Sequence, residues 1–155
     1  MKPFAVILIV LCAALATPLL AQDKSADNRT LVLEKVKADK KLLVAENMQL
    51  TEGEAKAFWP VYESYQRDLG KINDRLVKLI DDYAASHRTM TDAAATKLVD
   101  EAVAIESDRT KLAQSYLPKF KKVLPATKVA RYYQIENKIR AVVNYELAAR
   151  IPLVK

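Results

Sequence analysis

Apolar residues recur along most of this chain at alternating spacings of three and four, the pattern of an amphipathic α-helix. The clearest run follows Thr51, whose spacing to Glu54 is that of a capping box, so we expect a helix to start there. Pro60 lies beyond the first turn and predicts a bend. Asp74 and Lys78 are spaced to pair on the outer face. The apolar stripe comprises Ala55, Phe58, Tyr62, Tyr65, Leu69, Ile72, Leu76, Leu79 and Tyr83.

Three other segments show the same helical period. A first helix, capped by Asn28 or Thr30, is expected to run to about Asn47. Residues 86–89 are typical of a loop, and Thr91 then opens a third helix. The apolar positions of that third helix are Ala95, Leu98, Ala102, Ile105, Leu112, Tyr116 and Val123.

Leu124 and Pro125 precede the last pattern, and proline suits a helix start because its missing N–H is not needed there. Pro152 ends this helix. In the third helix, Pro118 predicts a second bend. Arg109 falls on the third helix's apolar stripe, where it either extends to solvent or pairs with a carboxylate across the interface. The apolar positions of the last helix are Val129, Tyr132, Tyr133, Ile135, Ile139, Val142, Val143 and Leu147.

These patterns predict an all-α fold of about four helices. Only two of the 155 residues are glycine, which leaves few places for the tight turns of β-hairpins. A short connection joins the second and third helices, so we expect an elongated, kinked antiparallel hairpin. Helices this long expose more apolar surface than one copy buries, which favours dimerisation or the binding of a partner.

A short pattern occurs twice, 74 positions apart. Each copy begins with leucine and a helix-starting residue, followed at fixed offsets by an apolar residue, an aromatic pair and a β-branched residue. Only the leucine is identical, so chance similarity between two amphipathic helices is the alternative to a true repeat. The two copies are Leu50, Thr51, Ala55, Phe58, Trp59, Val61 and Leu124, Pro125, Val129, Tyr132, Tyr133, Ile135.

The first 21 residues have the layout of a secretory signal peptide: Lys2, then an apolar run, then small and polar residues. We expect cleavage after Ala21, with Ala16 and an uncleaved membrane anchor as alternatives. Residues 22–155 would then form a single all-helical mature domain. The sole cysteine, Cys12, would be lost, leaving no disulfide and no thiolate.

The charge is unevenly distributed. Residues 22–110 hold 14 Lys and Arg against 17 Asp and Glu, whereas residues 111–155 hold 10 against 2. A basic C-terminal third suggests peripheral contact with an acidic surface, such as a membrane, an acidic partner or a polyanion. Nucleic acid is a poor candidate for a secreted protein, and a merely solvated basic face is the simpler alternative.

The sequence carries little that resembles catalytic chemistry. His87 is the only histidine, it falls in a predicted loop, and no cluster of His, Cys, Asp or Glu has the spacing of metal ligands. A glycine-rich phosphate loop is also missing. We therefore expect neither an enzyme nor a cofactor or metal site.

Aromatic and basic residues are the better candidates for function. Trp59 and Tyr133 each lie one position off an apolar stripe, so they either widen the buried face or form part of a binding surface. The candidate residues for binding a client or partner are Phe58, Trp59, Tyr62, Tyr132, Tyr133, Lys119, Lys121, Lys122 and Arg131.

At the two motif copies, near residues 50–62 and 124–136, the chain resembles the Spy/CpxP-type periplasmic proteins, a family named for its LTxxQ repeats. Leu50, Thr51 and Glu54 stand where the family has Leu, Thr and Gln, and Leu124, Pro125 and Lys128 stand at the second copy. The resemblance covers roughly residues 28–149. Both motif glutamines are replaced: Glu54 keeps the capping function, which Lys128 cannot supply.

The resemblance implies a periplasmic helical hairpin that forms a homodimer with a curved cradle. Such proteins act as ATP-independent chaperones or as envelope-stress sensors that modulate a sensor kinase. Some relatives bind metal through His-rich or Met-rich segments, which this chain lacks. Two hypotheses follow: a chaperone-like protein that binds unfolded proteins, and a stress-response regulator or adaptor that docks on one envelope protein.

Overall fold

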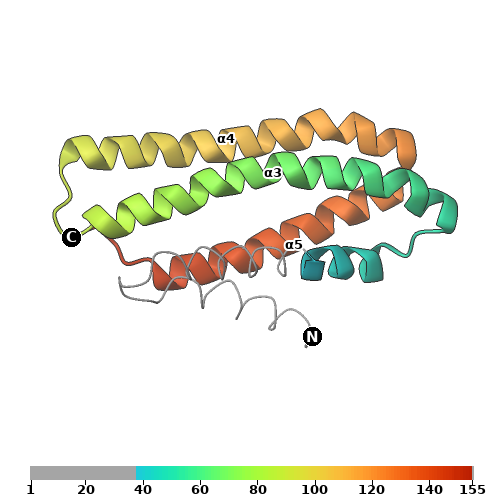
Figure 1. Cartoon of the computed structure of the whole chain (residues 1–155), viewed down its shortest axis with the longest axis horizontal. Helices are drawn as coiled ribbons and strands as arrows, with labels where there is room; N and C mark the ends of the chain where they lie inside the picture. Colours follow the sequence, from blue (N-terminus) through green and yellow to red (C-terminus); the bar gives the residue numbers. More distant parts are fainter. Residues whose placement is uncertain (1–37, 155) are drawn as a thin grey trace, which may run out of the picture. The chain divides into compact units, whose positions relative to one another are not determined.

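The computed structural model describes residues 38–154, and in that range the chain forms helices and no strand. The all-α prediction is therefore confirmed. The predicted signal peptide and the expected start of the first helix lie outside the described residues. The four helices in this range are residues 38–48, α3 (Glu52–Ser86), α4 (Asp92–Val123) and α5 (Ala126–Arg150) (Figure 1).

Local capping signals fix where the long helices begin. Thr51 precedes α3 and Thr91 precedes α4, and each threonine hydroxyl accepts an N–H from the first turn, as predicted. Pro125 immediately precedes α5, which begins at Ala126. The α3 helix includes Ser86, which the sequence placed in the loop.

Both long helices contain a proline. α3 continues through Pro60 and α4 through Pro118, so neither residue ends its helix. The bends expected at these two positions remain predictions. None of the helices within residues 38–154 combines the length and apolarity that crossing a membrane requires.

The described residues divide into two compact units, which we treat separately. The hairpin unit consists of residues 50–129 and 152–154, and the α5 unit of residues 38–49 and 130–151. The division falls inside α5, after its first turn. Within the hairpin unit, α3 and α4 lie side by side and antiparallel (Figure 1).

The predicted apolar stripes form the core of the hairpin unit. Burial is deepest where the start of α3 meets the end of α4, whereas Leu76, Leu79 and Tyr83 on the later part of the α3 stripe are only half-buried. Fully burying one such side chain contributes about 1.5–3 kcal/mol. The buried residues are Phe58, Tyr62, Tyr65, Leu69 and Ile72 on α3, and Ile105, Tyr116 and Phe120 on α4.

A charged network joins α3 to α4 further along the hairpin. The Arg75 guanidinium donates to both Glu101 oxygens, at 2.8 and 3.2 Å, and to Asp108 Oδ2 at 2.7 Å. These hydrogen bonds hold the pKa of each carboxyl below its usual value. Because all three side chains are partly exposed, the network contributes more to alignment than to stability.

One predicted ion pair is wrong. Lys78 pairs with Asp82 at 2.7 Å and not with Asp74. Both carboxylates are four residues from Lys78, so the spacing alone does not choose between them.

The α5 unit has its own small core. Leu43, Val44 and Met48 of the first described helix are buried, as are Tyr132 and Ile135 of α5. An ion pair accompanies them: Lys40 Nζ lies 2.9 Å from Glu136 Oε2, with both side chains mostly buried.

Candidate functional site

The first motif copy builds the start of α3 as a complete capping box. The Glu54 N–H donates to Thr51 Oγ1 at 3.3 Å, and the Thr51 N–H donates to Glu54 Oε2 at 2.8 Å. Two backbone donors that the helix itself leaves unpaired are thereby satisfied. The capping role predicted for Glu54 is confirmed.

The second motif copy begins its helix without a side-chain cap. Leu124 is extended and buried, and the Pro125 carbonyl accepts the N–H groups of Lys128 and Val129 at 2.9 and 3.0 Å. Proline has no N–H for an acceptor at position 128 to bind. A lysine at position 128 therefore costs this helix start no capping interaction.

The two copies are joined through their corresponding positions. Lys128 Nζ donates to Glu54 Oε2, the same oxygen that accepts the Thr51 N–H. The bond from Lys128 is the main reason that the pKa of Glu54 lies below its usual value, and the Thr51 N–H is the second. The start of α3 and the first turn of α5 are thus held together within the hairpin unit.

An aromatic cluster links the first half of α3 to the end of α4. The ring centroids of Phe58 and Phe120 are 5.8 Å apart, and those of Tyr65 and Tyr116 are 5.3 Å apart, so the contacts link α3 to α4. Trp59 packs edge-on against Phe58 at 5.1 Å. We call this end of the hairpin unit, formed by the start of α3, the end of α4 and the first turn of α5, the motif end.

A polar contact completes the cluster. The Tyr116 hydroxyl donates to Asp68 Oδ2 at 2.6 Å, which lowers the pKa of Asp68. Burial, together with this bond, raises the pKa of Tyr116. The Lys119 ammonium lies 3.8 Å from the centroid of the same tyrosine ring, a cation–π geometry.

The predicted binding aromatics fall into two groups. Phe58, Tyr62 and Tyr132 are core residues with exposed fractions of 0%, 3% and 1%. Trp59 and Tyr133, the residues one position off each stripe, are half-buried. Burial raises the pKa of Tyr133. A partner could contact the first group only if the helices separated. In the second group, part of each ring is accessible to a partner.

The predicted basic residues are exposed, and three of them have a structural role. Lys121 and Lys122 occupy the last turn of α4, where cations stabilise the negative end of the helix dipole. Arg131, in the α5 unit, donates to Gln49 Oε1 at 2.9 Å. Gln49 has φ 51°, a left-handed conformation that residues other than glycine seldom adopt, so Arg131 supports a strained turn.

Arg109 neither extends fully to solvent nor pairs with a carboxylate across the interface, the two alternatives predicted for it. Its side chain is 12% exposed, and its Nη1 donates to the Asn73 amide oxygen across the α3–α4 interface at 3.2 Å. The Nε atom is buried without a hydrogen-bond partner, and its paired carboxylate, Glu106 at 3.8 Å, lies on its own helix.

Two contributors were missed at the sequence level. Phe120 is fully buried, and the signal was its position one turn after Tyr116, on the far side of the interrupting Pro118. Arg75 carries the α3–α4 network, but its partners lie 26 and 33 residues away, so spacing along one helix gave no signal.

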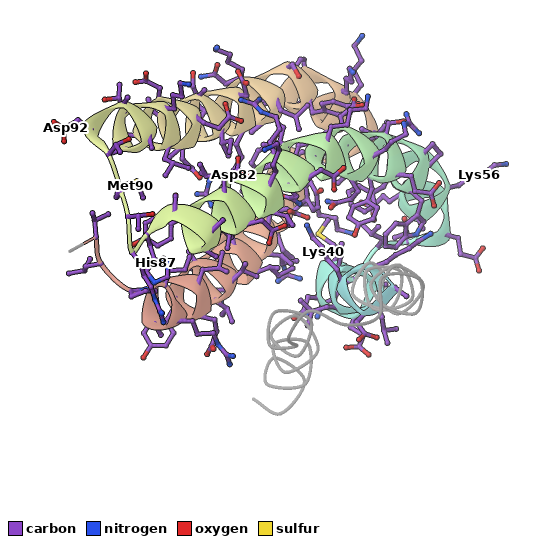
Figure 2. The ribbon with its side chains drawn as sticks, turned by 60° about the vertical axis from the view of Figure 1, so that its left-hand side comes forward. Lys40, Lys56, Asp82, His87, Met90 and Asp92 are labelled. Atoms are coloured by element: carbon purple, nitrogen blue, oxygen red, sulfur yellow. The ribbon has the colours of Figure 1, made fainter. Side chains whose placement is uncertain are left out.

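The histidine of the sequence lies at the other end of the hairpin. His87 caps α3 beside the connection to α4, and its Nδ1 lies 3.0 Å from the Ala84 carbonyl (Figure 2). Among residues 38–154, no group of three or more His, Cys, Asp or Glu could hold a metal ion.

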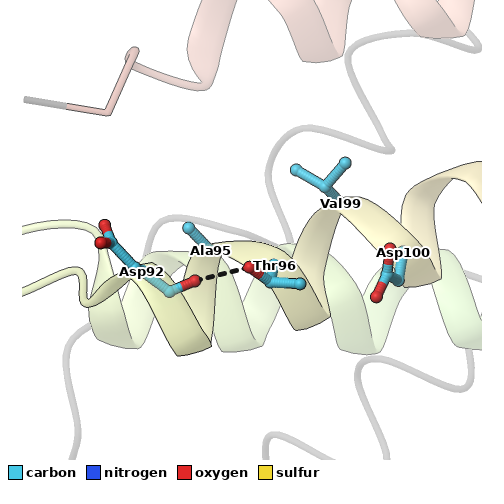
Figure 3. Close-up of a pocket in the computed structure, with 5 residues that line it drawn as sticks. All are labelled: Asp92, Ala95, Thr96, Val99 and Asp100. Atoms are coloured by element: carbon cyan, nitrogen blue, oxygen red, sulfur yellow. Dashed lines mark hydrogen bonds between the residues drawn. The ribbon is translucent and has the colours of Figure 1, made fainter.

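A shallow surface depression lies near the start of α4 (Figure 3). Its lining comes from α4 alone, and within it the Thr96 hydroxyl donates to the Asp92 carbonyl at 2.8 Å. Because no second helix closes it, the depression lacks the enclosure typical of a small-molecule site. The lining residues are Asp92, Ala95, Thr96, Val99 and Asp100.

Comparison of the chain with known protein families, with curated proteins and with solved structures finds no match.

Proposed function

We propose that this chain is a periplasmic, ATP-independent chaperone-like protein that binds unfolded or aggregation-prone proteins at its motif end. One observation carries the proposal. Exposed Lys119, Lys121 and Lys122 flank Phe120 in sequence, Phe120 packs on Phe58, and Phe58 packs on the half-buried Trp59. Cationic side chains and an accessible aromatic edge therefore belong to one small region of the hairpin.

This combination suits weak and unselective binding. Lysines attract unfolded chains over a distance of about one Debye length, roughly 8–10 Å at physiological salt. The indole of Trp59 then offers an apolar contact that tolerates partial wetting. Because Phe58 and Tyr62 are buried beneath Trp59, they support this surface and need not touch the client.

The proposal includes a homodimer. Val99 and Val103, one turn apart on α4, are 61% and 65% exposed, and Ala102 is exposed beside them. Small and β-branched residues in such a row allow close packing of a second helix. Replacing both valines with Glu should convert a dimer to a monomer in analytical ultracentrifugation. If the natural chain already sediments as a monomer, the dimer is excluded.

The test is light scattering of an unfolded client as it refolds, with and without residues 22–155, at low and high salt. We expect suppression of aggregation near equimolar amounts, weakened by salt. Trp59→Ala should reduce suppression while the far-UV circular dichroism is unchanged. As a charge control, Lys97→Glu/Lys138→Glu should suppress better than Lys119→Glu/Lys122→Glu, which changes the net charge equally.

Absence of suppression at several-fold excess would contradict the proposal. The alternative, an envelope-stress regulator or adaptor, would then be tested by pulldown for a single envelope partner. If the two lysine-pair variants reduce suppression equally, the motif end is also excluded as the binding region.

A further inference from the structure

The end of α4 belongs to a long stretch without negative charge. From residue 109 to residue 135 the sequence contains seven Lys and Arg and no Asp or Glu. Lys111, Lys119 and Lys122 are spaced so that they lie on one side of α4, and Lys121 lies beside them. All four are exposed. We call these four residues the lysine face.

The charges of this face are mostly uncompensated. Lys111 pairs with Asp108 at 3.3 Å, and Lys119 contacts the Tyr116 ring. Within residues 38–154, Lys119, Lys121 and Lys122 take part in no ion pair. The preceding stretch of α4 has the opposite character in sequence, with four carboxylates between residues 100 and 108. Arg75 of α3 pairs with two of them, Glu101 and Asp108.

None of the large apolar residues exposed in the described part of the chain lies on the lysine face, and the half-buried Trp59 belongs to α3. The large apolar residues exposed within residues 38–154 lie elsewhere: Leu42, Val77, Val99, Val103, Tyr145, Leu153 and Val154. Stable protein interfaces draw most of their affinity from buried aromatic and apolar anchors. The surface depression lies near the other end of α4, so nothing here selects one compact ligand.

All four cations of the face are lysines, which indicates the kind of partner that it binds. Lysine carries a compact charge on a flexible stem and does not form the fixed two-pronged contact that arginine makes with one phosphate or carboxylate. A row of lysines on an exposed helix fits a dense layer of anionic groups that has no fixed geometry.

We propose that the lysine face docks the hairpin unit on the anionic headgroups of a phospholipid membrane. Asp100 and Glu106, which do not pair with Arg75, would be repelled by the same surface, so α4 binds with its C-terminal half toward the lipid. This inference does not depend on client binding and concerns the attachment of the hairpin unit to a membrane surface.

The test is cosedimentation of residues 22–155 with vesicles of phosphatidylglycerol and phosphatidylcholine, beside vesicles of phosphatidylcholine alone. We expect binding to the anionic vesicles only, weakened by salt. Each lysine near such a surface contributes about fivefold in affinity, so Lys119→Glu/Lys122→Glu should weaken binding by about 25-fold or more. Lys97→Glu/Lys138→Glu, with the same net charge, should bind nearly as well as the natural chain.

Circular dichroism confirms that each variant is folded, and Lys119→Gln/Lys122→Gln replaces the Glu variant if that one is not. Equal binding to neutral vesicles, or equal loss in both charge variants, overturns the proposal. If the protein does not bind the vesicles but binds polyglutamate with the same lysine dependence, the face recognises an acidic polypeptide and the lipid assignment is wrong. Because no client is present, these outcomes are separate from those of the chaperone test.

Discussion

The two motif copies agree in what they bury and differ in how they start their helices. Phe58 and Tyr132, at matching offsets, are fully buried, and the next residues, Trp59 and Tyr133, are half-buried. The first copy has a threonine cap with a reciprocal glutamate, whereas in the second copy Pro125 occupies the threonine position. Agreement in burial thus does not require agreement in capping.

The difference between the copies is also what connects them. A proline at the helix start removes the N–H that the residue three positions later would accept, so position 128 has no capping function to keep. The lysine found there donates instead to Glu54, the capping residue of the other copy. Glutamate and lysine therefore form a salt bridge, which two glutamines at these positions could not form.

The largest expected loss of stability comes from the aromatic positions that both copies bury. Phe58→Ala and Tyr132→Ala should each lower the free energy of unfolding by about 3–5 kcal/mol, because each removes a fully buried ring and leaves a cavity. Urea denaturation followed by far-UV circular dichroism measures the loss. Trp59→Ala and Tyr133→Ala are the matched controls, with losses of about 1–2 kcal/mol. Equal losses in both groups would show that the buried and half-buried positions are not distinct.

The next largest loss of stability tests the difference in capping between the two copies. Thr51→Ala should cost about 1 kcal/mol of unfolding free energy, since the Glu54 N–H loses its acceptor. Pro125→Ala removes no side-chain cap, so its cost should be smaller and limited to the unfolded-state entropy that proline restricts. Thermal unfolding of the two variants side by side checks the order, and a larger loss from Pro125→Ala would contradict it.

The smallest effect depends on pH. The pKa of Glu54 is lower in the folded state than its ordinary 4.5. Its contribution to stability is therefore present above that value and is lost as the pH falls through the folded-state pKa. The stability difference between the natural chain and Glu54→Gln should shrink between neutral pH and about pH 3. Contributions from Asp68, Glu101 and Asp108 are common to both chains and cancel. A stability difference that is independent of pH would show that the charge of Glu54 does not stabilise the fold.

Helix positions were predictable because their signals are local. Thr51 and Thr91 cap helices through residues three positions away, and the apolar stripe of α3 repeats within one element. The all-α fold followed from these patterns and from the scarcity of glycine.

The contacts of the candidate site were less accessible to sequence reasoning. The Glu54–Lys128 pair spans 74 residues, and the Arg75 network depends on the register of α3 against α4. The choice of Asp82 over Asp74 by Lys78 depends on side-chain geometry that spacing does not encode. Periodicity identified which aromatics are buried, but it could not show that Phe120 completes their cluster.

Glu54 and Lys128 couple the two motif copies. The most direct measurement is a double-mutant cycle of Glu54→Gln and Lys128→Gln, followed by urea unfolding at low and high salt. Glutamine keeps the capping acceptor at position 54 and removes only its charge. We predict a favourable coupling energy that diminishes with salt, so that the double variant is more stable than the two single losses imply. Strictly additive losses, unaffected by salt, would contradict the claim.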